Sequence, residues 1–74
     1  MSKLPVLKPL QLVRFLERLG FQRIRQKGSH LYLRHLDGRA TVVPIHKGED
    51  LSPGLLRSIL QDIKLTRQEF LDLR

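Results

Sequence analysis

Residues 27–45, KGSHLYLRHLDGRATVVPI, decide the fold. Residues 30–35 alternate between apolar and polar side chains, and residues 40–45 are rich in threonine and valine, as is typical of β-strands. The Asp-Gly pair between the two runs is a strong signal for a tight hairpin turn. We therefore predict two antiparallel strands, and Pro44 indicates an edge position or the end of the second strand.

The alternation assigns the side chains of the first of these strands to two faces. Leu31 and Leu33 point to one face, whereas His30, Tyr32 and Arg34 point to the other. If helices cover the leucines, the second face is open to solvent.

The neighbouring segments supply helices and a third strand. Residues 8–19 repeat apolar side chains at three- and four-residue spacing, and Gly20 follows as a stop signal. Residues 21–26 indicate a strand with weak alternation, which a Lys-Gly-Ser turn follows. Ser52 is a good N-cap for a second helix, and residues 66–69 form a capping-box pattern that opens a short third helix.

The expected order is helix, three antiparallel strands, helix and short helix, in a single domain spanning residues 1–74. This order predicts an α+β fold in which a three-stranded antiparallel sheet is covered by helices on one face. Double-stranded-RNA-binding domains have the same αβββα order, although the order of elements alone does not establish function.

Positive charge is concentrated in the middle of the chain. The protein has 14 Lys and Arg residues against 7 Asp and Glu residues, a net charge of +7. Residues 23–47 have a balance of +5, whereas residues 48–74 have a balance of −1. A concentrated basic patch on a small domain favours a polyanion such as a nucleic acid as the partner, over a surface that is merely basic and soluble.

The composition disfavours several other classes of protein. The chain has no cysteine, which excludes disulfides and thiolate metal ligands and fits a reducing cytoplasm. Its apolar runs are far shorter than the roughly 20 residues of a membrane span. The first residues, MSKLP, lack the apolar run of a secretory signal. We expect a cytoplasmic protein that does not bind a membrane.

Three histidines are the candidates for chemistry. His30 and His35 are five residues apart on one predicted strand and face opposite ways, which is not a metal-ligand spacing, so we expect no metal site. A serine nucleophile is poorly supported, because Ser29 and His30 are adjacent and point apart. His46 lies in a polar loop and stays a possible second participant in acid–base chemistry.

His30 is best suited to act as a general base on RNA. RNA carries its own nucleophile, the 2′-hydroxyl, so a protein need only bind the phosphate, remove a proton and stabilise charge on the phosphate oxygens. One imidazole near a basic patch meets this minimum, and general base catalysis contributes about 10²–10⁴-fold. Lys27 and Arg34 are the candidates for phosphate contacts, and Ser29 and Tyr32 are weaker candidates for RNA binding. The competing interpretation is that His30 merely begins a strand.

Several blocks of the sequence resemble the HicA (YcfA-like) family of toxins. Residues 19–21, LGF, and residues 25–30, RQKGSH, are similar to its pattern LGF…R.KGSH. Residues 43–46, VPIH, and residues 51–60, LSPGLLRSIL, resemble its downstream pattern VP.H…L..G.LR.IL. The blocks occur in the same order as in the family and span nearly the whole chain.

The resemblance implies a fold like that of double-stranded-RNA-binding domains. It also implies that the protein cleaves mRNA without a metal or other cofactor and thereby stops translation. It implies that His30, in Gly-Ser-His, is the catalytic residue. It further implies a HicB-type antitoxin that covers the active face, and contact with DNA only through that antitoxin. One departure is Leu31, where many members have a second histidine; if Leu31 faces the core, we expect the loss to matter little.

Two other functions fit the same residues. A non-catalytic RNA-binding module would share the fold and the basic patch, and would recognise duplex RNA mainly through its shape and backbone. A protein-interaction subunit would use the basic face to bind an acidic partner. The toxin differs from both alternatives because it should cleave RNA and bind a protein partner, with the two activities competing.

Overall fold

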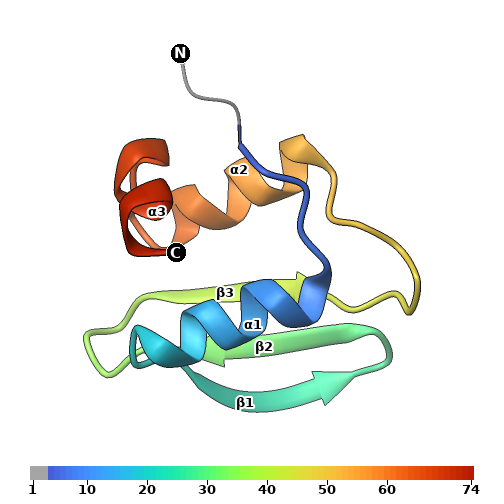
Figure 1. Cartoon of the computed structure of the whole chain (residues 1–74). Helices are drawn as coiled ribbons and strands as arrows, with labels where there is room; N and C mark the ends of the chain where they lie inside the picture. Colours follow the sequence, from blue (N-terminus) through green and yellow to red (C-terminus); the bar gives the residue numbers. More distant parts are fainter. Residues whose placement is uncertain (1–3) are drawn as a thin grey trace.

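The computed structural model describes residues 4–74, which form three helices and three strands (Figure 1). The elements are, in chain order, α1 (Pro9–Arg18), β1 (Gln22–Lys27), β2 (His30–Arg34), β3 (Ala40–Pro44), α2 (Pro53–Asp62) and α3 (Arg67–Leu73). The strands form one antiparallel sheet in the order β1-β2-β3, so β2 is the central strand. The predicted αβββα order and the α+β fold of double-stranded-RNA-binding type are confirmed.

Local sequence signals account for the ends of the elements. The first helix and the three strands begin and end within one residue of their predicted bounds. Pro44 is the last residue of β3, as expected of a residue that has no N–H for the ladder. The Ser52 side chain accepts a hydrogen bond from the backbone N–H of Leu55 at the start of α2. Thr66 and Glu69 cap each other at the start of α3, which confirms the predicted capping box.

The hydrophobic core lies between the helices and one face of the sheet. Leu31, Leu33 and Val43 project from β2 and β3 into this core and are at most 3% exposed. In Figure 1, α1 lies over the sheet and roughly along the strands, while α2 also contacts β3 and α3 packs on α2. The Phe15 and Phe70 rings, with centroids 4.9 Å apart in an edge-to-face arrangement, join α1 to α3. The predicted assignment of leucines to the covered face is therefore confirmed.

Strand β1 contains a β-bulge that the sequence alone did not predict. Arg23 pairs with Leu33 and Arg25 pairs with Tyr32, so Ile24 is an extra residue between two paired positions. A bulge sets two consecutive residues opposite one residue of the partner strand and interrupts the alternation of faces. This irregularity explains the weak alternation in this segment, and every residue of β1 is exposed.

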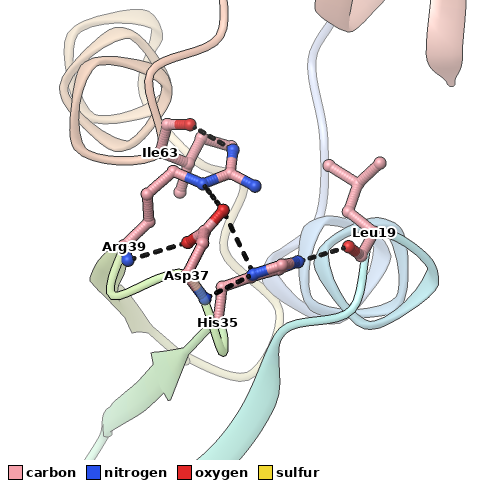
Figure 2. A network of polar contacts seen from close by, with 5 residues as sticks. All are labelled: Leu19, His35, Asp37, Arg39 and Ile63. Atoms are coloured by element: carbon pink, nitrogen blue, oxygen red, sulfur yellow. Dashed lines mark hydrogen bonds and ion pairs between the residues drawn. The ribbon is translucent and has the colours of Figure 1, made fainter.

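A polar cluster ties the β2–β3 hairpin to the ends of two helices (Figure 2). His35 Nδ1 accepts a hydrogen bond from the Asp37 backbone N–H at 3.1 Å, so the ring proton on Nε2 can be donated to the Leu19 carbonyl at 3.0 Å. Arg39 donates from Nε to the Asp37 carboxylate at 2.8 Å and from Nη1 to the Ile63 carbonyl at 2.7 Å. The hairpin is thereby fixed to the residues that follow α1 and α2.

Candidate functional site: the open face of the sheet

The strand register brings most of the predicted site residues together on one face. His30 is the first residue of β2 and pairs with Lys27 of β1 and with Pro44 of β3. Directly opposed residues of antiparallel strands project their side chains from the same face. Tyr32 and Arg34 follow His30 at two-residue steps and share that face. Lys27, His30, Tyr32 and Arg34 therefore lie on the face opposite the helices, here called the open face.

The turn before β2 positions His30. Gly28 and Ser29 form a two-residue loop between β1 and β2, and Gly28 has a φ of 59°. Glycine with positive φ at the first loop position is the pattern of a type II′ turn, which suits the twist of antiparallel strands. The Ser29 carbonyl accepts a hydrogen bond from the Ile45 N–H at 2.6 Å, which joins the turn to the end of β3. Ser29 thus lies beside the open face, in the turn, rather than on the strand.

His30 is exposed and accessible to a ligand. No hydrogen bond from another atom of residues 4–74 engages its imidazole, so both ring nitrogens are available. An imidazole in this position can accept a proton from a bound hydroxyl or donate one to a bound oxygen.

The surroundings of His30 are basic. Within the described part of the chain, the three strands contain no Asp or Glu. Arg25, Lys27 and Arg34 add positive charge to the open face, whereas Arg23 points to the helix side and contacts Glu17 of α1 at 3.3 Å. The strands therefore give the open face a positive charge, which suits a phosphate backbone.

Arg25 belongs to this face, and our sequence analysis did not select it. It pairs with Tyr32, and its guanidinium carbon lies 5.0 Å from the centroid of the Tyr32 ring, within cation–π range. The two-residue turn could have revealed it, because counting back two positions from Lys27 returns to the same face. The pairing with Tyr32 itself required the register of the sheet.

The other two histidines have different settings. His35 lies just beyond β2 in the polar cluster of Figure 2, where it contributes to structure. His46 is exposed in the loop after β3, two residues beyond Pro44, and so lies at the same end of the sheet as His30. Among residues 4–74, no three side chains of His, Asp or Glu are grouped so that they could hold a metal ion.

Comparison with known families identifies the chain. A family model described as the HicA toxin of bacterial toxin–antitoxin systems matches residues 11–65. The chain belongs to the HicA toxin family. The match runs from α1 to beyond α2 and includes all three strands, with Lys27, Ser29, His30, Tyr32 and Arg34.

Membership settles the general role of this HicA toxin. It is a toxin of a toxin–antitoxin system, and such a system implies an antitoxin partner. No curated protein matches the chain closely enough to add to this assignment. None of the helices in residues 4–74 is long and apolar enough to cross a membrane.

Proposed function

We propose that this HicA toxin is a metal-independent endoribonuclease that cleaves mRNA in the cytoplasm, with His30 as the catalytic residue. The observation that carries the proposal is the position of His30, which is exposed, opposite Lys27, on the central strand of a basic sheet whose three strands, all within residues 4–74, contain no Asp or Glu. Family membership supports it, because the toxin must act on a cellular target.

The chemistry requires few protein groups. His30 accepts the proton of an RNA 2′-hydroxyl, and the resulting oxygen attacks the adjacent phosphorus. The bond from phosphorus to the 5′-oxygen breaks, which leaves a 2′,3′-cyclic phosphate on one fragment and a 5′-hydroxyl on the other. The departing oxygen takes a proton from water or from a second acid, for which His46 is the candidate. Because the nucleophile belongs to the RNA, no metal-activated water is needed.

The remaining residues of the open face bind the substrate. Lys27 and Arg34 contact phosphates and stabilise the charge that develops on the phosphate oxygens. Ser29, beside His30 in the turn, and Tyr32, on the same strand, provide further RNA contacts.

A HicB-type antitoxin would neutralise the toxin by covering this face. The net charge of +7 favours an acidic partner surface, and burial of His30 under it excludes the substrate. Contact with DNA is then made through the antitoxin. Cleavage should accordingly fall as antitoxin is added, and mRNA should compete with the antitoxin for the toxin.

The test is cleavage of a long single-stranded RNA in excess EDTA, resolved on a denaturing gel. The wild type should cleave, and His30→Ala, purified in the same way and shown by circular dichroism to be folded, should be slower by about 10²–10⁴-fold. Equal cleavage by both proteins would refute His30 as the catalytic residue. RNA binding without cleavage by the wild type would instead establish a non-catalytic RNA-binding module.

His46→Ala separates the role of the second histidine. A large loss of rate in this variant, with His30 intact, would identify His46 as the acid. Cleavage at the wild-type rate would leave protonation of the departing oxygen to water.

A further inference from the structure

The open face carries a shallow depression to which the proposed cleavage assigns only general RNA contacts, at Tyr32 and Arg34. It has a volume of about 350 Å³ and extends across all three strands. Its floor is apolar and consists of Tyr32 on β2, Val42 opposite it on β3, and Ile24 on β1. Ile24 is 56% exposed, an unusual environment for a large apolar residue in the middle of a basic surface. A flat apolar group would bury this floor.

The bulge in β1 creates the floor. Without it, alternation from Lys27 would turn Ile24 towards the helices; with it, Ile24 and Arg25 both lie opposite Tyr32. Arg25 is 5.0 Å from the Tyr32 ring centroid, so it restrains the ring from one side. Tyr32 is half-buried between Arg25 and its other cross-strand neighbour Val42, so part of the residue remains accessible to a ligand. Tyr32 is therefore a preorganised stacking surface.

A hydrogen-bond acceptor stands at the rim of the depression. Asp62, the last residue of α2, lines it, and the Thr41 hydroxyl donates to Asp62 Oδ2 at 2.8 Å. This bond holds the carboxylate while the second oxygen remains able to accept. A carboxylate accepts hydrogen bonds from the exocyclic amino groups of cytosine and adenine, whereas uracil presents a carbonyl there.

We propose that the depression is a nucleobase-binding site that stacks one base of the RNA on Tyr32 and selects a base with an exocyclic amino group through Asp62. This proposal rests on the proposed function, because it gives the RNA substrate its base preference. Tyr32 and His30 are two residues apart on one strand, about 6.6 Å along the backbone. A nucleotide with its phosphate at His30 therefore places a neighbouring base over the depression.

Binding of short oligonucleotides tests the site separately from catalysis. The probes are fluorescent 2′-O-methyl hexacytidylate and hexauridylate, which lack the nucleophile, and anisotropy is measured at about 0.15 M salt, since affinity depends on ionic strength. The wild type should bind the cytidine probe more tightly. Tyr32→Ala should weaken binding of this probe roughly 5- to 100-fold, the range for loss of one stacked base, while Tyr32→Phe should retain it.

Asp62→Asn is the specific variant. Its amide oxygen can still accept from Thr41, but its amino group would face the base and favour the uracil carbonyl, so the preference should be lost or reversed. Arg14→Ala is the control for a change in net charge away from the depression, because Arg14 is exposed on α1, on the covered side of the sheet. It should alter the affinity for both probes equally.

The outcomes separate this proposal from the proposed function. Equal binding of the two probes by the wild type, or wild-type affinity in Tyr32→Ala, would overturn the base site even if the toxin cleaves mRNA. A base preference that Tyr32→Ala and Asp62→Asn abolish would establish the site even if His30→Ala proved as active as the wild type.

Discussion

Replacement of Arg39 by alanine should destabilise the fold more than the loss of any surface ion pair. Arg39 is the residue through which the β2–β3 hairpin reaches the end of α2, by its bond to the Ile63 carbonyl (Figure 2). Ile63 is fully buried, so in the Arg39→Ala variant its carbonyl would lose this charged donor without gaining contact with water. The guanidinium also lies 5.2 Å from the centroid of the buried Phe21 ring.

The expected loss follows from these two contacts. A hydrogen bond to a charged group contributes about 1.5–3 kcal/mol, and a cation–π contact at a partly exposed site about 0.5–1 kcal/mol. The Arg39 side chain is 25% exposed, so solvent screening reduces both, and the bond to the exposed Asp37 carboxylate is not counted. We expect the free energy of unfolding to fall by about 2–3 kcal/mol. For a domain of this size, this lowers Tm by about 10–20 °C.

The measurement is urea unfolding followed by circular dichroism, with every variant compared in the same His30→Ala background, the variant proposed to be inactive. The midpoint should fall by about 2–3 M for an m-value near 1 kcal/mol/M, with the m-value unchanged. The matched control is Arg23→Ala, which removes only the exposed contact with Glu17 and should cost no more than about 1 kcal/mol. If Arg39→Ala is no less stable than Arg23→Ala, the role assigned to the Ile63 contact is wrong.

Two further predictions concern the same hairpin. Gly20→Ala should be about 1 kcal/mol less stable than Gly38→Ala in thermal unfolding. Both glycines have φ near 100°, but only at Gly20 would an added Cβ lie 2.9 Å from His35 Nε2 and displace that ring. Equal losses of stability in the two variants would contradict this contact. Hydrogen bonds from the Arg39 backbone N–H and, secondarily, from its side chain hold the pKa of Asp37 below its usual value of 3.8. The ionised carboxylate therefore stabilises the fold above pH 3.8, and this stabilisation is lost as the pH falls through the lower pKa of the folded protein. The difference in unfolding free energy between the wild type and Asp37→Asn should accordingly shrink on acidification.

Local signals in the sequence determined the helices, the turns and the faces of the central strand. Helix caps such as Ser52 and Thr66 act within three residues, and the alternation of residues 30–34 is set by the two-residue period of a strand. The Gly-Ser-His block similarly placed His30 at the start of β2, after a tight turn. These features depend on contacts between near neighbours, which a sequence displays directly.

Only the tertiary structure decided which residues line the open face and which of them are in contact. The bulge at Ile24, the contact of Arg25 with the Tyr32 ring and the approach of Asp62 to the sheet join residues that are far apart in the chain or shift the register between strands. A single extra residue in β1 reverses the face of its neighbours, and nothing in the local sequence marks where it occurs. His35 likewise looked like the end of a strand, and it became part of a polar cluster only because folding brings the residue after α1 beside the hairpin.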